Sequence, residues 1–251
     1  MEATLDRAGY SIHYKTIGAG PRVVWVDPAL GSSAMRPLED VIDELARHFA
    51  VVTYDRRGRG RNEPTANLSV GDEVEDLVAL VSEVGGAAVV LGFSSGGAVV
   101  LHAAPRLDAH AVVLLEPAVD AKPDESGLRE RVADALARGD DTAAVLAFYD
   151  ALGVPEEIVQ EQVSSSAWPH VVRSAPTLLT DIDLAVVDDD AIAAIGLPTH
   201  VIVSAGSPDE ITAMADQLAG RLKARLWREP GGWHGVDARA LAERLGALQG
   251  S

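Results

Sequence analysis

The chain has 251 residues, contains no cysteine, and carries a formal net charge of −17 at pH 7. This acidic balance argues against nucleic acid or an anionic membrane as a partner, and the lack of cysteine excludes disulfides and thiolate chemistry. The first residues carry neither a basic start nor an apolar segment, and no apolar run approaches the roughly 20 residues that a membrane helix needs. We therefore expect a cytoplasmic protein with one large core.

Predicted strands and helices alternate along the first half of the chain. Strands are expected in a hairpin at 4–16 and at 22–26, 49–54, 87–91 and 111–115, with helices at 38–45, 70–84 and from about residue 95. The apolar positions of 70–84 recur at helical spacing behind Ser69, a predicted N-cap, whereas most strands are short continuous apolar runs. Such alternation predicts a mostly parallel sheet covered by helices on both faces.

The pattern changes in the middle of the chain. Residues 120–188 contain helical segments but no convincing strand, and the alternation then resumes with a strand at 198–204, a helix at 210–222, a strand at 225–227 and a last helix after 237. We interpret the chain as a single domain whose core comprises about 1–118 and 191–251. Residues 119–190 are then a helical insertion.

The junction at 89–100 carries the strongest functional motif. An apolar run ends at Gly92, a helix of small residues begins near Ser95, and the segment 92–96 between them spells G-x-S-x-G around Ser94. In a strand–turn–helix context this motif predicts a sharp turn that exposes one serine hydroxyl above the sheet. A phosphate-binding turn is the alternative, but neither G-x-G-x-x-G nor G-x-x-x-x-G-K-[ST] is present.

Other polar residues follow predicted strands. Glu116 closes the apolar strand 111–115. Asp209 directly precedes the helix 210–222, where it is also a candidate N-cap, and His234 lies in a Gly-Gly-Trp-His-Gly turn after the last strand. The segment 55–62 is basic and rich in glycine. We expect its arginines to make local hydrogen bonds within a turn.

Together these motifs resemble the α/β-hydrolase family over essentially the whole chain. Residues 55–60 match the D-x-R-G-x-G loop after the fourth strand, 92–96 are similar to the nucleophile elbow after the fifth, and His234 stands where the family places its catalytic histidine. The helical insertion falls after strand six, where these enzymes carry a cap. The resemblance implies an α/β-hydrolase fold with a mostly parallel eight-stranded sheet, helices on both faces and a helical cap.

One segment departs from the common pattern. Most family members read His-Gly after the third strand, whereas this chain reads Asp27-Pro28-Ala29. It is similar to a bacterial subgroup with Asp-Gly-Ala there and Glu-Pro after the sixth strand, which Glu116-Pro117 matches. Pro28 has no N–H to donate, but the family's donor is the next residue, here Ala29. We expect the Asp27 carboxylate to point away and hydrogen-bond the loop.

The resemblance implies a role for each candidate. Ser94 would be the nucleophile, His234 its base, and the N–H groups of Ala29 and Ser95 the oxyanion hole. The acid stays open between two residues: Asp209 occupies the family's G-x-x-D position, whereas Glu116 ends the strand beside the elbow strand, and we favour Glu116. The candidate substrate-binding residues are Leu30, Phe93, Phe148, Trp168 and His170.

We therefore predict a serine hydrolase that cleaves a small carboxylic ester or lactone through an acyl-enzyme, with a small-molecule substrate and neither metal nor organic cofactor. A thioesterase, perhydrolase or C–C bond hydrolase would use the same triad, because fold and triad do not determine the substrate. A binding protein with little turnover is the alternative of another class. A serine-reactive phosphonate distinguishes it, since only an activated serine reacts.

Overall fold

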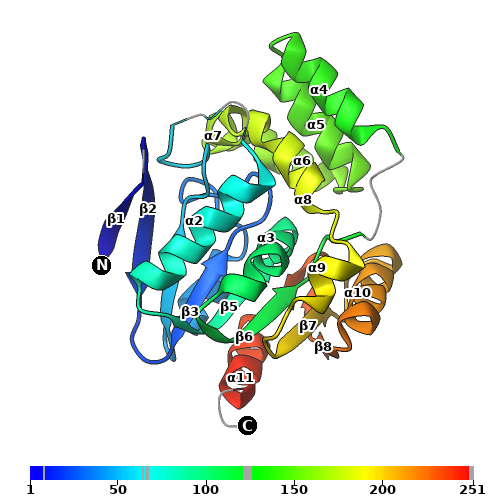
Figure 1. Ribbon diagram of the computed structural model, residues 1–251. Coiled ribbons are helices and arrows are strands. Elements are labelled where there is room, and N and C mark those ends of the chain that lie inside the picture. Colours follow the sequence, from blue (N-terminus) through cyan, green and yellow to red (C-terminus); the bar gives the residue numbers. More distant parts are fainter. Residues whose placement is uncertain (8, 64, 66–67, 121–125, 249–251) are drawn as a thin grey trace.

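The computed structural model describes residues 1–7, 9–63, 65, 68–120 and 126–248. Its core is one sheet of eight strands in the order β1-β2-β4-β3-β5-β6-β7-β8 (Figure 1). The strands are β1 (Glu2–Arg7), β2 (Tyr10–Ile17), β3 (Arg22–Val26), β4 (Ala50–Tyr54), β5 (Ala87–Phe93), β6 (Ala109–Leu115), β7 (Thr199–Ser204) and β8 (Arg225–Glu229). The hairpin β1–β2 and the pair β2–β4 are antiparallel, and every other neighbouring pair is parallel.

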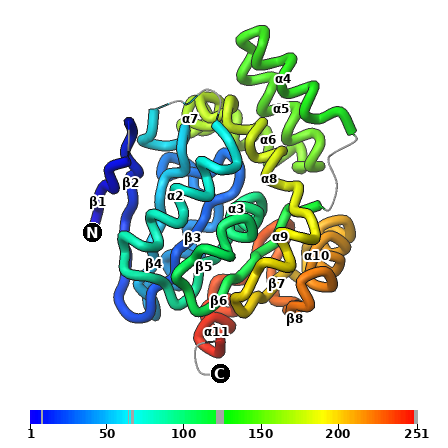
Figure 2. The backbone as a smooth tube through the Cα atoms, viewed as in Figure 1, coloured from blue at the N-terminus to red at the C-terminus, as the bar shows by residue number. Residues whose placement is uncertain are grey.

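Helices cover both faces of this sheet, as the tube view also shows (Figure 2). On one face lie α2 (Val70–Glu83), α3 (Ser95–Ala103), α9 (Asp189–Ala193) and α10 (Asp209–Leu222); on the other lie α1 (Glu39–Leu45) and α11 (Ala238–Leu248). Alternate residues of one strand serve the two faces: Val90 packs with α2 and α3, whereas Leu91 packs with α1 and α11. This two-sided burial explains why the central strands are continuously apolar.

Helices alone connect β6 to β7 within the described residues. They are α4 (Leu128–Ala137), α5 (Asp141–Ala151), α6 (Glu156–Ser164), α7 (Trp168–Arg173), α8 (Leu178–Leu184) and α9. Figure 1 shows α4–α7 standing above the sheet, while α8 and α9 lead back to the core. We call α4–α8 the cap. The cap has its own apolar cluster, into which Leu30 from the loop after β3 is packed, so the cap sits over the carboxyl ends of the parallel strands.

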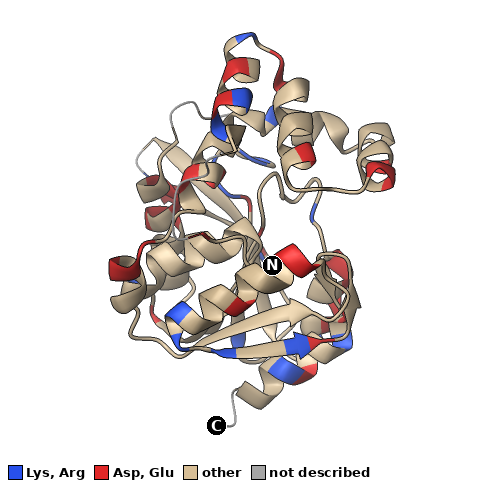
Figure 3. Ribbon diagram, turned by 90° about the vertical axis from the view of Figure 1, so that its right-hand side faces the viewer, with Lys and Arg blue, Asp and Glu red and all other residues tan. Residues whose placement is uncertain are grey.

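The α/β-hydrolase fold with a helical insertion after strand six is confirmed. Residues 121–125 of the predicted insertion lie outside the described residues. Several elements are longer than expected, with β5 continuing to Phe93 and β8 to Glu229, and a small hairpin of β9 (Gly231–Gly232) and β10 (Gly235–Val236) surrounds His234. Acidic residues are spread over core and cap (Figure 3). No helix in the described part of the chain is long and apolar enough to cross a bilayer.

Candidate active site

Ser94 occupies a strained turn between β5 and α3. Its backbone has φ 52° and ψ −122°, well outside the regions that residues with a Cβ prefer. The turn is tight because its glycines touch backbone: a Cβ on Gly92 would lie 2.4 Å from the carbonyl oxygen of Gly96, and one on Gly96 would lie 2.3 Å from that of Val26. The G-x-S-x-G spelling therefore follows from close approach on both sides of the serine.

Several residues around this turn have a strained backbone conformation with positive φ. Six non-glycine residues in the described segments have positive φ: Leu30, Leu38, Ser94, Glu116, Lys223 and His234. Three of them are the predicted nucleophile, base and favoured acid, and a fourth directly follows the predicted oxyanion donor Ala29. Such conformations cost about 1–3 kcal/mol each and persist where the surrounding structure over-determines them, which is common at functional sites.

The structure brings Glu116 and His234 together. Phe93 and Leu115 are paired in the sheet, and the amide of Ser94 donates to the Leu115 carbonyl at 2.9 Å, so Ser94 and Glu116 lie at adjacent strand ends. His234 Nδ1 lies 3.5 Å from Glu116 Oε2 and has no other partner in the described part of the chain. The imidazole also packs on the Phe93 ring, with 4.9 Å between ring centroids.

The Glu116 carboxylate is fully buried and firmly held. The backbone N–H of Ser204 donates to Oε1, and the Ser207 hydroxyl donates to Oε2 at 2.7 Å. Asp209, the rival acid, is the exposed first residue of α10 and, within the described residues, forms no hydrogen bond or ion pair with His234. Ser207 lies between β7 and α10, and its hydroxyl supports the carboxylate at the end of β6. Geometry thus favours Glu116 as the partner of the imidazole.

The Ser94 hydroxyl has no hydrogen-bond partner among the described residues, His234 included. In ligand-free sites such contacts are often long and shorten only when substrate binds. Ser94 is nearly buried, at 9% exposure, and His234 is half-buried, with 21% of its side chain exposed. The hydroxyl and imidazole thus lie at the same edge of the sheet with limited access to water.

Two backbone N–H groups that follow the neighbouring strands β3 and β5 have no protein acceptor among the described residues. In the described structure, neither the N–H of Ala29 nor that of Ser95 donates a hydrogen bond. Ser95 is the first residue of α3, where the helix dipole also favours negative charge. Asp27 does not compete for this position, because its buried carboxylate accepts from Trp25 Nε1 at 2.8 Å and Arg36 Nε at 2.9 Å. Burial raises the pKa of Asp27, which Arg36 partly offsets.

The predicted substrate-binding residues have different environments. Leu30 and Phe148 are buried together in the cap cluster, with Trp168 half-buried against it. Phe93 is buried beside the His234 imidazole, whereas His170 is exposed on α7. In the described segments no group of three His, Asp or Glu side chains could hold a metal ion.

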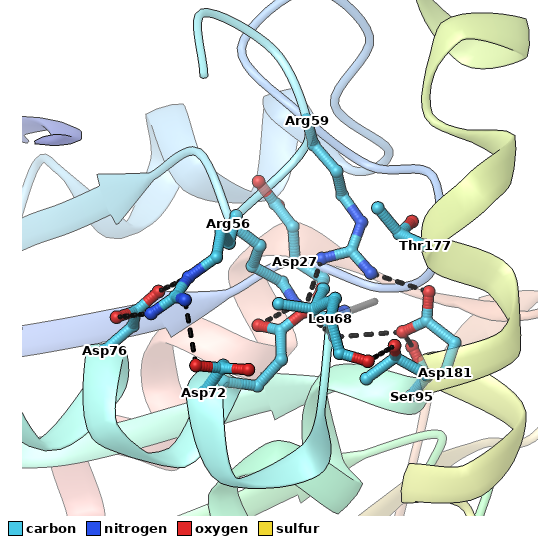
Figure 4. Close-up of polar contacts among 12 residues, drawn as sticks. Asp27, Arg56, Arg59, Leu68, Asp72, Asp76, Ser95, Thr177 and Asp181 are labelled. Atoms are coloured by element: carbon cyan, nitrogen blue, oxygen red, sulfur yellow. Dashed lines mark hydrogen bonds and ion pairs between the residues drawn. The ribbon is translucent and has the colours of Figure 1, made fainter. Parts of the chain in front are cut away.

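We expected the arginines of 55–62 to make local hydrogen bonds within a turn, but the side chains of Arg56 and Arg59 bind distant carboxylates instead. Arg56 and Arg59 are fully buried and form ion pairs with Glu73 of α2 and Asp181 of α8 (Figure 4). Arg56 and Arg59 occupy the two variable positions of the D-x-R-G-x-G motif, so the motif does not single them out. Nothing in the sequence around Asp181 distinguishes it from the other acidic residues of the cap.

Comparison with known proteins agrees with this geometry. Residues 18–244 match the model of the alpha/beta hydrolase family. An alpha/beta hydrolase from Sphaerobacter thermophilus DSM 20745 is 32% identical, with TM-score 0.85 over 98% of this chain and 99% of that one. The enol-lactonase from Burkholderia xenovorans LB400 is 20% identical, with TM-score 0.75 over 99% and 100% of the two chains.

A sequence relative is much longer. The polyketide synthase ThaQ of Burkholderia thailandensis is 30% identical over 246 residues, which span 87% of this chain but 11% of ThaQ. The family match and the similar structures support hydrolase activity. The strand order, the serine elbow and a family match that covers most of the sequence lead to one conclusion: this chain belongs to the alpha/beta hydrolase family.

Proposed function

We propose that this protein is a serine hydrolase that cleaves a small carboxylic ester or lactone through an acyl-enzyme on Ser94. The observation that carries the proposal is the pairing of His234 Nδ1 with the buried Glu116 carboxylate, at the end of the strand beside the strained serine. A histidine so paired is held in the tautomer whose other nitrogen can accept a proton.

Each group has a defined part in this proposal. Ser94 Oγ attacks the ester carbonyl as His234 Nε2 accepts its proton, and the Glu116 carboxylate stabilises the imidazolium that forms. The N–H groups of Ala29 and Ser95 bind the oxyanion of the tetrahedral intermediate. The imidazolium then protonates the leaving alcohol. In the second half, His234 takes a proton from water as the water oxygen attacks the acyl-enzyme. The bond from the acyl carbon to Ser94 Oγ then breaks, the imidazolium returns the proton to Oγ, and the carboxylic acid is released.

The choice of substrate rests on the surroundings of the site. The cap cluster over the strand ends is apolar and includes Leu30, Phe148 and Trp168, which suits a non-polar acyl or alcohol part. Lactones belong in the proposal because the enol-lactonase from Burkholderia xenovorans LB400 shares the fold over its whole length.

Labelling with a fluorophosphonate tests the proposal directly. We expect stoichiometric labelling of the wild-type protein, with the adduct mapped by mass spectrometry to the peptide that contains Ser94. Ser94→Ala should abolish labelling, and Ser82→Ala, at an exposed position of α2, should leave it unchanged. Absence of labelling in the folded wild type would support a binding protein instead.

A substrate panel then separates activities that share the triad. Aryl esters of increasing chain length, small lactones, acyl thioesters and a C–C cleavage substrate are compared by kcat/KM. Highest values for esters or lactones support the proposal. If kcat/KM for thioesters exceeds that for esters by more than about tenfold, thioesters become the assigned substrate class. Such a ratio corresponds to about 1.4 kcal/mol in activation free energy.

A further inference from the structure

Four fully buried charges meet between the core and the cap. Arg56 and Arg59 come from the loop after β4 and Asp181 from the cap helix α8 (Figure 4). Glu73 comes from α2. Arg56 Nη2 lies 3.0 Å from Glu73 and 2.9 Å from Asp181, while Arg59 lies 2.8 Å from Glu73 and 2.7 Å from Asp181. Two positive charges thus face two negative charges. We call these four residues the buried quartet.

Asp181 is the cap's contribution to the buried quartet. Burial by itself would raise its pKa, but Arg56 and Arg59 outweigh that effect and lower it, so the side chain is a carboxylate. Replacing such a buried ionic cluster by apolar side chains is often neutral or stabilising. Its presence is therefore weak evidence for a role in stability, whereas the fixed geometry of paired guanidinium groups suits a role in position.

The quartet touches both sides of the candidate oxyanion hole. The Ser95 hydroxyl donates to Asp181 Oδ1 at 3.2 Å, and the N–H of the same Ser95 is one proposed oxyanion donor. On the other side, Arg56 Nη1 donates to the backbone carbonyl of Asp27 at 3.2 Å, two residues before the second donor, Ala29. The Asp181 carboxylate thus contacts the Ser95 segment directly, and it contacts the segment that contains Ala29 through the Arg56 side chain.

A second set of contacts joins the same elements. Leu30, directly after Ala29, packs in the cap cluster with Leu178 and Ile182, which lie on α8 with Asp181. The Thr180 hydroxyl of that helix donates to the Leu68 carbonyl at 2.8 Å, ahead of α2. Helix α8 therefore contacts the oxyanion loop by apolar packing as well as through the quartet.

We propose that Asp181 is a positioning residue that couples the seating of the cap to the geometry of the oxyanion hole. The inference rests on the proposed function, in which Ala29 and Ser95 supply the donors. With the cap seated, Asp181 holds the Ser95 hydroxyl and orients Arg56 against the Asp27 carbonyl. A cap that is displaced, or that lacks this carboxylate, leaves both donors less well placed for the oxyanion.

Asp181→Asn is the direct test, and Asp183→Asn is its matched control. Asp183 lies two residues away on α8, is exposed, and forms its one ion pair within the described segments with Arg129 of the cap, at 2.8 Å. Loss of an entire oxyanion donor costs about 10²–10³ in kcat. For Asp181→Asn, which shifts the donors without removing them, we expect kcat on an aryl ester to fall about 10- to 100-fold, with KM changed less than about threefold. Asp183→Asn should stay within about twofold of wild type.

Inhibition by an alkyl trifluoromethyl ketone separates positioning from loss of stability. This compound forms an anionic adduct with the serine, so its affinity reports on the oxyanion hole. All assays are run well below the unfolding temperature of each variant. If Asp181 positions the donors, the Ki of the ketone for Asp181→Asn rises in parallel with the loss of kcat/KM. A variant that is merely less stable, with unchanged kcat and Ki, overturns the inference.

Ser95→Ala provides the second variant. It removes the hydroxyl that binds Asp181 but keeps the Ser95 backbone N–H and all four charges of the buried quartet, so it tests the link if Asp181→Asn does not fold. We expect Ser95→Ala to lower kcat and raise Ki, and the double variant to lose no more than Asp181→Asn alone. The inference is contradicted if Ser95→Ala keeps wild-type kcat and Ki. It is also contradicted if the losses of Ser95→Ala and Asp181→Asn add fully in the double variant.

Hydrogen exchange distinguishes failure of this inference from failure of the proposed function. In Asp181→Asn, but not Asp183→Asn, amides at 29–31 and 95–97 should exchange faster. Unchanged exchange there overturns the coupling even if Ser94 is the nucleophile. Faster exchange in a protein whose wild type does not react with fluorophosphonate supports the coupling and rejects the proposed function.

Discussion

Nδ1 of His234 lies 3.5 Å from Oε2 of Glu116, although more than a hundred positions of sequence separate the two residues. Both have positive φ, and the carboxylate is held from its other sides by the Ser204 amide and the Ser207 hydroxyl. These contacts aim the carboxylate at the imidazole. Mutation of Glu116 and of Asp209 therefore tests which of the two residues is the acid.

Glu116→Gln should cripple the enzyme while leaving the fold intact. The amide oxygen can replace Oε1 against the Ser204 N–H, which places the amide NH₂ near Ser207 and His234 Nδ1. An NH₂ donating to Nδ1 stabilises the tautomer whose Nε2 already carries a proton, so His234 no longer acts as a base. We expect kcat to fall about 10³- to 10⁴-fold, as with the corresponding change in serine proteases.

Asp209→Asn is the matched comparison, since it makes the same change at the rival position. Asp209 lies exposed in the first turn of α10, where a charge contributes about 0.3–1 kcal/mol to the helix. We expect a loss of activity below about tenfold. Both variants are measured on one aryl ester, with circular dichroism as the control for folding. A crippled Asp209→Asn beside a nearly normal Glu116→Gln would restore the usual family arrangement.

Ser94→Ala should lower kcat by roughly 10⁴- to 10⁶-fold without loss of fold. The substitution keeps a Cβ at the strained position and removes only the hydroxyl, which makes no hydrogen bond in the described structure. Thermal unfolding should therefore be close to that of wild type. Retention of more than a tenth of wild-type hydrolysis would show that another group is the nucleophile.

Trp168→Ala should change chain-length preference more than stability. Trp168 begins α7 and packs, half-buried, against the apolar cluster that contains Leu30. If the cap roofs the substrate site, removing the indole creates room for longer acyl chains. We expect kcat/KM to rise for long relative to short aryl esters, whereas Leu152→Ala, at a cap residue that is 49% exposed, should leave the ratio unchanged. Equal ratios in both variants would assign Trp168 to packing alone.

The stability contributed by Asp181 should depend on pH in a defined direction. Burial alone would raise the pKa of this carboxylate, but Arg56 and Arg59 lower it below the ordinary value of 3.8. A group whose pKa is lower in the folded state stabilises the fold above its unfolded-state pKa, and that stability is lost as the pH falls through the folded-state value. The contribution of Asp181 is therefore complete at pH 5–7 and declines below about pH 4.

Urea unfolding of wild type and Asp181→Asn measures this contribution. Breaking a buried ion pair costs about 3–5 kcal/mol, which we expect as the difference between the two proteins at pH 7. The difference should stay constant to about pH 5 and shrink below pH 4. Asp183→Asn, at the exposed cap pair, should differ from wild type by less than about 1 kcal/mol throughout. A difference that grows toward low pH would contradict the assigned sign.

Local patterns in the sequence determined the fold class, the family and the position of the serine turn. The continuous apolar runs predicted the parallel strands, and the residues 92–96 predicted the elbow because close backbone contacts restrict those positions to glycine. The helical stretch between two alternating regions likewise marked the insertion after β6. Each strand and the serine turn arise within about ten residues of chain, and the insertion is a run of such local helical patterns, so spacing along the sequence is enough to predict them.

Only the tertiary structure decided which distant polar groups meet. Both Glu116 and Asp209 follow predicted strands, and the sheet order with the path of the 231–236 hairpin brings His234 to the first and not to the second. The cap partner of Arg56 and Arg59 could not be predicted either, because Asp181 lies more than 120 positions away in a helix that also carries Asp183. A buried charge must find an opposite charge, but the packing of the cap on the core selects which one.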